Sequence, residues 1–584
     1  MQQHSYQLAR VMLLYTLLSW IGMRLFSTYT GIIRFSSFVD LRRVAYANLF
    51  SMFLVWAIHY LVYFAPTTSL EHMTSRLIVV TFVLATIVMC GTRVLIKSLF
   101  EITMTNNKAM RALIYGTMSG GVALAKSIRM QDPVRFELKG FITHDPHDSH
   151  DQLMGQRVYG IDDDLKTIID EKNIEAILVS PLRNDDFRKN QQLQDTLINA
   201  GIKIYMAQNA AEWKEDSNGI QMHEVSVEDL LPRDEIKVDM ESVGRELTGK
   251  RILITGSAGS IGSEMVRQIA VYKPAAMMLI DQAETPQHDI RLMMASNYPD
   301  IPAETIVTSI SRQTRMDAIF KRFRPDYVFH AAAYKHVPMM EDNPSEAVLN
   351  NIQGTKIIAD LSVKYGVKKF VMVSTDKAVN PTNVMGCSKR ICEIYVQSLN
   401  KEQDTTQFVT TRFGNVLGSN GSVIPLFREQ IKSGGPVTVT HPDIIRFFML
   451  IPEACKLVLE AGTKGKGGEI FAFDMGQPVR IADLAARMIK LSGAKNIEVK
   501  FTGLREGEKL YEEVLNEAEG TKPSFHEKIR IAEVHVYDYN EIAKQIDQLI
   551  AISKDYDDMA TVRKMKEIVP EYKSNNSVYE QLDN

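Results

Sequence analysis

The chain has 584 residues, too many for one hydrophobic core, so about two or three domains are expected. Its formal net charge of −3 lacks the basic excess of nucleic-acid-binding proteins, and no nucleic-acid partner is expected. The four cysteines show no paired metal spacing, which indicates a reducing compartment and gives no reason to expect a metal.

Apolar segments open the chain and predict a transmembrane helical region over residues 1–105. Residues 44–65 and 77–99 are long enough to span a bilayer and contain no acidic residue. Residues 8–26 are shorter, with arginines near both ends, and are interpreted as a marginal span or an interfacial helix. A signal peptide is discounted, because no small-residue cleavage site follows.

Basic residues predict how these segments are oriented. Arg34, Arg42 and Arg43 lie between the first and second segments, which places that loop in the cytoplasm. The loop over residues 66–76 carries one basic residue and is placed outside. Everything after the third segment is then cytoplasmic, and the lipid bilayer is an expected partner.

A first α/β domain is expected over residues 106–240. Strand patterns at 112–115, 136–142, 176–179 and 202–206 alternate with helical ones, which predicts a parallel sheet. The glycine turn after the first strand lacks a middle glycine, and Met118 stands where a backbone would approach a pyrophosphate. We therefore expect a degenerate Rossmann-like domain that binds no dinucleotide. The acidic, proline-bearing residues 229–239 are expected to form a linker.

A second α/β domain is expected over residues 241–584. Six strand patterns separated by helical ones predict a doubly wound parallel sheet, at 251–255, 277–281, 305–308, 327–330, 370–374 and 408–412. The chain as a whole is thus of the α/β class, with two Rossmann-like domains behind transmembrane helices. Turn-rich segments beyond residue 412 suit a small substrate-binding lobe. The polar chain after residue 570 is expected to be poorly ordered.

The turn after the strand 251–255 predicts a dinucleotide site. Gly256, Gly259 and Gly262 let backbone N–H groups approach a pyrophosphate at a helix N-terminus. Such a triplet alone is weak, but Asp281 ends the next strand 19 residues beyond Gly262 (281 − 262), where an acidic residue binds the adenosine ribose. NAD is therefore favoured over NADP. The remaining cofactor-binding residues expected in this turn are Ser257, Ser260 and Ile261.

Two further strand ends carry candidate residues. The strand 327–330 is followed by three small residues that would let a nicotinamide ribose approach, although tight helix packing explains them equally well; they are Ala331, Ala332 and Ala333. The strand 370–374 runs into Thr375, Asp376 and Lys377 at the sheet edge where ligands bind. An ordinary turn with a surface lysine is the alternative for this second group.

Several long motifs in order carry a family resemblance: TGSAGSIG, HAAAYKHVP, STDKAVNPTNVMGCSK and RFGNVLGSNGSVIPLF. Together with Asp281, they resemble the extended short-chain dehydrogenase/reductases. More narrowly, the chain is similar to the CapD-like, membrane-bound nucleoside-diphosphate-sugar 4,6-dehydratases of bacterial surface-polysaccharide synthesis. The resemblance covers nearly the whole chain and implies a multi-pass protein of the bacterial inner membrane.

The resemblance implies a UDP-sugar substrate, most simply UDP-N-acetylglucosamine. In this chemistry the cofactor oxidises carbon 4 of the sugar, and a base removes the acidified proton on carbon 5. The carbon 6 hydroxyl then leaves as water, and the hydride returns to carbon 6. The product is a 4-keto-6-deoxy sugar, and the reaction requires one acid and one base at the sugar.

The resemblance also assigns roles to individual residues. Asp376 is the acid for the leaving hydroxyl, Lys377 is the base, and Thr375 hydrogen-bonds the sugar near carbon 4. Lys377 must be partly neutral, so desolvation or Lys389 would have to depress its pKa. The remaining contacts implied for the substrate are Lys335, His336, Asn415, Arg446 and Arg505.

Met385 takes the place of the tyrosine in the Tyr-x-x-x-Lys motif of most short-chain dehydrogenases, while Lys389 is retained. The two lie four residues apart on one face of a helix expected after Asn383. Methionine cannot carry a proton, but the large membrane-bound dehydratases are known to have methionine here. The resemblance therefore keeps both among the catalytic residues, with Lys389 also on the cofactor.

Two features depart from the family pattern. Ser309 stands where the family has an aspartate near the adenine, and four spans are usual where three segments are found, which suggests a shortened start. A UDP-sugar 4-epimerase is an alternative that Met385 disfavours, and a catalytically silent nucleotide-sugar-binding regulator is another. A polyprenyl-phosphate sugar-1-phosphate transferase is excluded by TGSAGSIG. Carbon 5 epimerisation, the pathway, the ligand of the first α/β domain and a homo-oligomeric state stay open.

Overall fold

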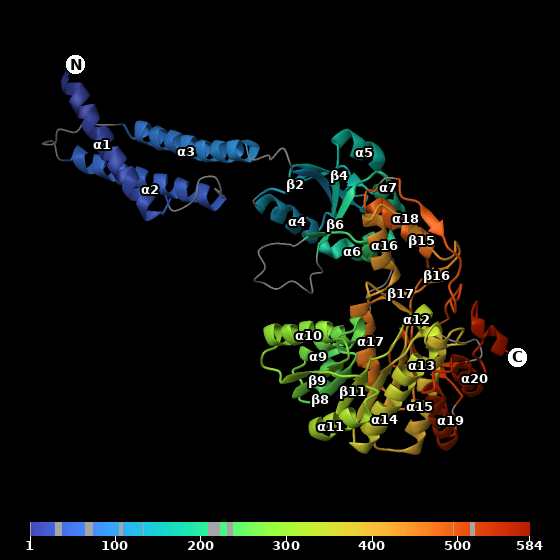
Figure 1. Ribbon diagram of the computed structural model, residues 1–584. Helices are drawn as coiled ribbons and strands as arrows, with labels where there is room; N and C mark the ends of the chain where they lie inside the picture. Colours follow the sequence, from blue (N-terminus) through green and yellow to red (C-terminus); the bar gives the residue numbers. More distant parts are fainter. Residues whose placement is uncertain are drawn as a thin grey trace.

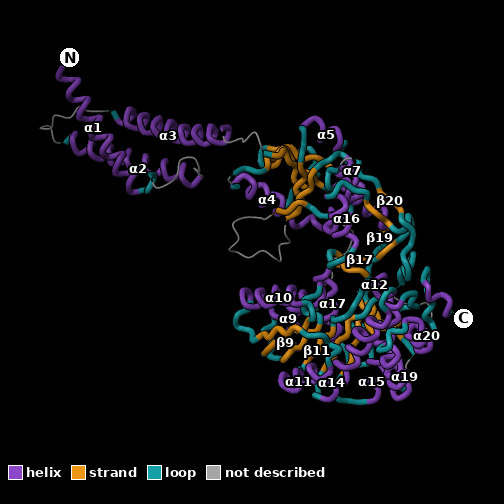
Figure 2. The backbone as a smooth tube through the Cα atoms, in the orientation of Figure 1, coloured by secondary structure: helices purple, strands orange, loops and turns teal. Residues whose placement is uncertain are grey.

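The computed structural model describes residues 2–29, 38–64, 74–103, 109–131, 133–145, 147–207, 222–230, 238–494, 496–513, 520–535 and 537–583. Three N-terminal helices lie apart from two α/β units that follow along the chain (Figure 1). Strands are concentrated in those two units, each of which contains its own sheet (Figure 2).

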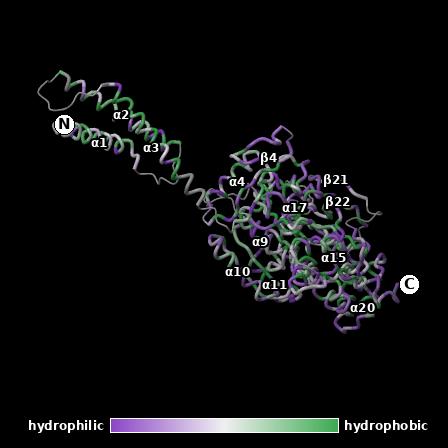
Figure 3. The backbone as a smooth tube through the Cα atoms, turned by 90° about the horizontal axis from the view of Figure 1, so that it is seen from above, coloured by the Kyte–Doolittle hydropathy of each residue, from purple (hydrophilic) through white to green (hydrophobic). Residues whose placement is uncertain are grey.

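The N-terminal helices are α1 (Gln2–Leu25), α2 (Phe38–Tyr63) and α3 (Ser75–Thr103). In the described part of the chain two helical segments are long and apolar enough to cross a membrane, Phe38–Leu61 and Ser75–Ile96. Hydrophobic residues run along both helices (Figure 3). The two longer apolar segments expected from the sequence are therefore helices, whereas α1 does not qualify as a span. The loops on which the orientation depends fall largely outside the described residues.

The first α/β unit holds a seven-stranded sheet in the order β3-β4-β2-β1-β5-β6-β7. Its four expected strands are present, and β3, β4 and β7 are additions that the sequence patterns missed. The strands are β1 (Met110–Tyr115), β2 (Phe136–Thr143), β3 (Gln152–Leu153), β4 (Gln156–Gly160), β5 (Ala176–Val179), β6 (Lys203–Ala207) and β7 (Met222–Glu224). The helices are α4 (Ser119–Met130), α5 (Leu165–Lys172), α6 (Asn184–Lys189) and α7 (Gln191–Asn199).

The second α/β unit is built on a nine-stranded sheet in the order β10-β9-β8-β11-β12-β13-β18-β22-β21. Seven neighbouring strands are parallel. From β8 the strands are added toward one edge of the sheet up to β10, and from β11 toward the other edge, so the strand order reverses between β8 and β11, as in a doubly wound sheet. They are β8 (Arg251–Thr255), β9 (Ala276–Asp281), β10 (Ala303–Val307), β11 (Tyr327–His330), β12 (Lys369–Val373), β13 (Gln407–Arg412) and β18 (Ile470–Phe473). β22 (Ile529–Glu533) and β21 (Gly520–Pro523) add an antiparallel edge.

Helices cover both faces of this sheet (Figure 1). Both faces of the central strands are therefore buried, which explains why the sequences of these strands are continuous apolar runs. One face packs on α8 (Met240–Leu247), α9 (Ser260–Ala270), α10 (Glu284–Asn297) and α17 (Ile451–Lys464). The other packs on α11 (Gln313–Phe323), α14 (Gly354–Lys364), α15 (Val384–Glu402), α19 (Tyr539–Ser553) and α20 (Asp558–Ile568). The six strands expected from the sequence are confirmed, with ends shifted by one or two residues.

A smaller lobe sits over the carboxyl edge of the sheet. It contains three two-stranded pairings, β14 (Asn415–Leu417) with β17 (Phe448–Leu450), β15 (Val437–Val439) with β20 (Val499–Phe501), and β16 (Ile445–Arg446) with β19 (Val479–Arg480). Its helices are α16 (Val423–Lys432) and α18 (Ile481–Leu491). α18 also contacts the first α/β unit, where Arg487 pairs with Asp195 at 2.7 Å. The turn-rich chain beyond residue 412 thus forms the lobe that the sequence predicted.

The chain after residue 570 is ordered against the second unit, so the expectation of a poorly ordered tail is wrong. The Asn575 N–H donates to the Thr382 carbonyl at 3.2 Å, and the Asn575 carbonyl accepts from the Gly507 N–H at 2.8 Å. Ser577 donates to buried Glu341 at 2.7 Å. Polar composition misled the prediction, because these polar groups bond to backbone and side chains that lie far away in sequence.

Candidate functional site

A cavity of about 880 Å³ opens between the carboxyl edge of the large sheet and the smaller lobe. Most of the residues predicted for the site line it: Gly256, Gly259, Ser260, Ile261, Gly262, Ala331, Ala333, Lys335, His336, Thr375, Lys377, Met385, Lys389, Asn415, Arg446 and Arg505. A neighbouring cavity of about 290 Å³ is lined by Asp281, Ala332 and Ser309, and shares Gly256 with the first. Ser257 and Asp376 are buried beside the cavities, among the residues described.

The glycine turn between β8 and α9 makes a close backbone cradle. Gly256 has φ +70°, and a Cβ there would lie 2.7 Å from the Ala332 nitrogen. A Cβ on Gly262 would lie 1.9 Å from the Gly256 carbonyl oxygen. Larger residues are therefore excluded at both positions. Gly259 has no side chain that could cap α9, so no cap hydrogen bond occupies the N–H groups of the first turn. This turn lines the cavity, and N–H groups at a helix N-terminus can bind an anion.

Asp281 ends β9 at the smaller cavity and also holds the turn in place. Its two carboxylate oxygens accept from the backbone N–H groups of Ala258 at 3.0 Å and Ala283 at 2.9 Å. Each carboxylate oxygen keeps a second lone pair. The geometry is thus compatible with a ribose hydroxyl as a further donor.

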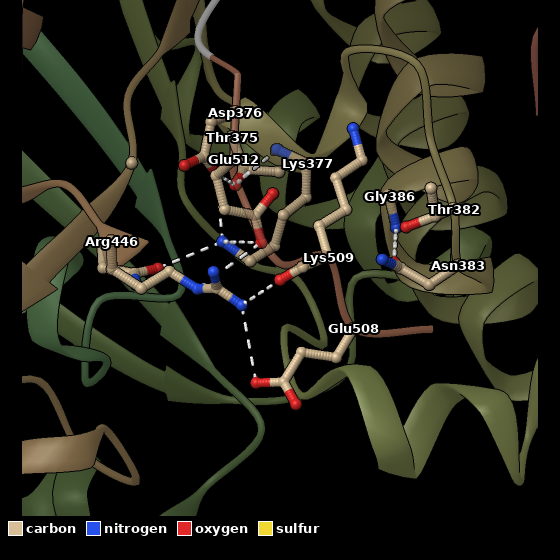
Figure 4. A network of polar contacts seen from close by, with 12 residues as sticks. Thr375, Asp376, Lys377, Thr382, Asn383, Gly386, Arg446, Glu508, Lys509 and Glu512 are labelled. Carbon is tan, nitrogen blue, oxygen red and sulfur yellow. Dashed lines mark hydrogen bonds and ion pairs between the residues drawn. The ribbon is translucent and has the colours of Figure 1, made fainter. Parts of the chain in front are cut away.

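Thr375, Asp376 and Lys377 follow β12 directly and form one hydrogen-bonded group (Figure 4). The Thr375 hydroxyl donates to Asp376 Oδ1 at 2.8 Å. Lys377 Nζ donates to the same oxygen at 3.1 Å and to Asn415 Oδ1 at 3.1 Å. A possible acid and a possible base therefore touch each other at the edge of the large cavity.

The charge state of Lys377 differs from the one the sequence led us to expect. Burial lowers the pKa of Lys377, but the carboxylates of Asp376 and Glu512 raise it more, and the pKa ends above its ordinary value. The expectation that desolvation or Lys389 depresses the pKa of Lys377 is therefore wrong for the substrate-free protein. Lys389 itself is buried, and burial lowers the pKa of that lysine.

Met385 and Lys389 are brought to the cavity by α15. Asn383 caps this helix, because its side-chain oxygen accepts from the Gly386 N–H at 2.7 Å. The start predicted at residues 381–383 is therefore confirmed. Met385 is only 3 % exposed and lines the cavity, so an apolar side chain stands where the Tyr-x-x-x-Lys pattern would place a tyrosine.

Arg446 of the smaller lobe is held by the 505–513 segment. Its guanidinium donates to the Lys509 carbonyl at 2.7 Å and pairs with Glu508 at 3.5 Å. Arg505 lies on the same segment, at the exposed rim of the cavity. The structure brings both predicted arginines to one wall, which suits a diphosphate.

Sequence reasoning missed Glu512. Its carboxylate is buried, 3.6 Å from Lys377 Nζ and 3.8 Å from Arg446 Nε. Nothing in the acidic run around it distinguishes this residue from its neighbours. Only the fold places it between the two cations Lys377 and Arg446.

The doubly wound sheet, the glycine cradle and the lobe over its carboxyl edge define a nucleotide-binding domain of the short-chain dehydrogenase/reductase type. The family model "polysaccharide biosynthesis protein" matches residues 252–534, and a CoA-binding-domain model matches residues 28–207. Capsular polysaccharide biosynthesis protein CapD of Staphylococcus aureus is 41% identical over 443 residues, covering 75% of this chain and 74% of that protein. The chain belongs to the family of CapD-like polysaccharide biosynthesis proteins.

Further similarities were found to a second curated relative and to a solved structure. The probable polysaccharide biosynthesis protein EpsC of Bacillus subtilis is 39% identical over 463 residues, which is 78% of this chain and 77% of that protein. Among solved structures, Pen from Bacillus thuringiensis is 34% identical, with a TM-score of 0.46, over 50% of this chain and 89% of its own. UDP-glucose 4-epimerase of Rickettsia canadensis is also similar, 35% identical over 279 residues, which is 47% of this chain and 80% of that protein.

Proposed function

We propose that the chain is a membrane-anchored 4,6-dehydratase that converts UDP-N-acetylglucosamine to a UDP-4-keto-6-deoxy sugar for bacterial surface glycans. The observation that carries the proposal is the contact at 3.1 Å between buried Asp376 and Lys377, which lines the cavity together with Met385, the residue that replaces the usual proton carrier. Dehydration needs an acid and a base besides the oxidising centre. A simple dehydrogenase or epimerase needs no such pair.

The cradle fits a dinucleotide, since Gly256 and Gly262 leave room that a Cβ would fill. The residues that would hold NAD are Gly256, Ser257, Gly259, Ser260, Ile261, Gly262, Asp281, Ala331, Ala332, Ala333 and Lys389. A bound nicotinamide supplies the oxidant for carbon 4 and later reduces carbon 6, so none is consumed.

Asp376 and Lys377 together hold the protons that dehydration moves. Transfer of one proton from Lys377 Nζ to Asp376 Oδ1 turns the ion pair into a neutral amine and a carboxylic acid. Lys377 then accepts the proton from carbon 5, while Asp376 gives its proton to the carbon 6 hydroxyl, which leaves as water. The pair ends the elimination as it began, ionic. Oxidation at carbon 4 releases one hydroxyl proton, and the return of the hydride to carbon 6 takes up one proton at carbon 5, so the whole reaction closes without a net change in protons. Thr375, bonded to Asp376, is placed to donate to the oxygen on carbon 4.

The nucleotide diphosphate is assigned to the wall formed by the smaller lobe. Arg446 and Arg505 supply cations there, and Asn415 lies between this wall and Lys377. Lys335 and His336 face the same cavity from the chain after β11. Substrate phosphate at Arg446 would replace Glu508, whose contact at 3.5 Å is long for a charge-assisted hydrogen bond.

Turnover tests this function directly. The protein is incubated with NAD and UDP-N-acetylglucosamine, and the keto sugar is followed by its absorbance in base. Appearance of the 4-epimer without keto sugar would identify an epimerase instead. Binding of the nucleotide sugar with neither product would identify a silent regulator.

NAD is expected to bind more tightly than NADP. The carboxylate of Asp281 would meet the 2′-phosphate of NADP as a like charge, which costs roughly 1–3 kcal/mol, or about ten- to a hundredfold in affinity. Titration of both cofactors measures this gap, and Asp281→Asn, which removes the charge but keeps an acceptor, should narrow it. Equal affinity in the unaltered protein would mean that Asp281 does not contact the ribose.

The membrane anchor predicts a topology that labelling can check. A cysteine placed at Thr68 should react with an impermeant thiol reagent in intact cells, whereas one at Ser37 should be protected. Both positions lie outside the described residues, so the prediction depends on the basic residues alone. The opposite labelling pattern would reverse the orientation.

A further inference from the structure

Glu512 is a buried carboxylate that the roles proposed above leave unexplained. Its side chain is 4% exposed, and its Oε1 lies 3.6 Å from Lys377 Nζ. Its Oε2 has no hydrogen-bond partner among the described residues. An unsatisfied buried carboxylate oxygen costs free energy. Oε1 is compensated by the two cations beside it, Lys377 and Arg446, whereas Oε2 is not.

Charged groups face Lys377 from several elements. Asp376 and Glu512 are the anions, and Arg446 and Lys335 are the cations. Burial disfavours the ammonium form of Lys377, and the two carboxylates favour it. Asp376 already has a proposed role as the acid. Glu512 has no such role, so it can influence the charge of Lys377 without taking part in proton transfer to the substrate.

We propose that Glu512 is a positioning residue that acts through Lys377, holding the ammonium group beside Asp376 and setting the pH at which Lys377 can accept a proton. The proposal rests on the proposed role of Lys377 as the base. Glu512 belongs to the same short segment as Arg505 and Glu508, which line the substrate cavity. The wall that receives the diphosphate and the group that controls the base are therefore one stretch of backbone (Figure 4).

The pH dependence of kcat/KM distinguishes this role from a purely structural one. Dehydration as proposed starts with one proton shared by Lys377 and Asp376, so kcat/KM should fall at high pH along a limb that reports loss of this proton from Lys377. Glu512→Gln removes one anion and should move that limb to lower pH, whereas Glu512→Asp, which keeps the charge, should restore it toward its original position. Glu508→Gln, which removes the other carboxylate on Arg446, should leave the midpoint in place. A lower rate in Glu512→Gln with an unmoved limb would overturn the proposal.

A second measurement needs no turnover. Competitive labelling with acetic anhydride at a series of pH values, read by peptide mass spectrometry, reports the protonation of Lys377 in the substrate-free protein. Lys377 should label at lower pH in Glu512→Gln than in the unaltered chain. Identical labelling curves would overturn the proposal for Glu512. Absence of keto sugar from the unaltered protein would instead overturn the proposed function, and the labelling curves would still decide the effect of Glu512 on Lys377.

Discussion

Lys377→Ala and Asp376→Asn are each expected to abolish dehydration while NAD stays bound. Loss of a general acid or base lowers rates by about a hundred- to ten-thousandfold. This cavity offers Met385, which cannot carry a proton, where the Tyr-x-x-x-Lys pattern would place a tyrosine. The measurement is keto-sugar formation in parallel with cofactor titration. Asp376→Asn preserves the shape of a buried side chain, so its effect should report the lost proton.

Met385→Tyr is the matched control for this result. A tyrosine there would restore the usual motif with Lys389, but no large gain is expected, because Asp376 and Lys377 already move the protons. Near-normal turnover in Lys377→Ala or Asp376→Asn would remove these two residues from the mechanism. A large gain in Met385→Tyr would show that proton transfer at carbon 4 limits the unaltered protein.

Glu393→Ala is expected to destabilise the second α/β unit by about 3–5 kcal/mol, because breaking a buried ion pair leaves an uncompensated charge. Glu393 is fully buried on α15 and accepts from Arg412 at 2.6 and 2.8 Å. It also accepts from the Ser374 hydroxyl at 2.7 Å. Burial opposes ionisation of Glu393, but the nearby arginines outweigh burial and hold the pKa of this carboxyl below its ordinary value.

Urea unfolding measures the loss, and two variants sharpen it. Glu393→Gln keeps the side-chain shape and should cost less than alanine, although the charge is gone. Glu304→Gln, in an exposed pair with Arg322, should change stability little, because surface ion pairs are weak. Ser374 directly precedes Thr375, so folded Glu393 variants should also lose turnover. An unchanged unfolding midpoint in Glu393→Ala would show that this network is dispensable.

Local patterns predicted most of the second unit, since each element depends on neighbouring residues. The strand Arg251–Thr255 and the helix beginning after Asn383 were correct because an apolar run, a glycine turn and a capping side chain act within a few residues. In the first unit β4 was missed, because its short sequence, QRVYG, mixes polar and apolar residues without a clear alternation.

The candidate residues were predicted as a group, but their electrostatics were not. Motifs that end strands of one parallel sheet must meet at one edge, so Gly256, Ala331 and Thr375 could be placed together from sequence. The pKa of Lys377 could not be predicted from sequence, because it depends on burial and on charges that include those on segments distant in the chain. The same limit hid Glu512 until the fold placed it beside Lys377.

By itself, the sequence determined the α/β class, the glycine cradle and the family, since these depend on residue spacing along short segments. The tertiary structure alone decided that Lys377 is held as a cation between Asp376 and Glu512. It also decided that residues beyond 570 pack against the loops at 381–383 and 504–508. The Lys377–Glu512 pair and the contacts of the tail join residues more than 60 positions apart. Such contacts arise from how the chain closes on itself rather than from any local pattern.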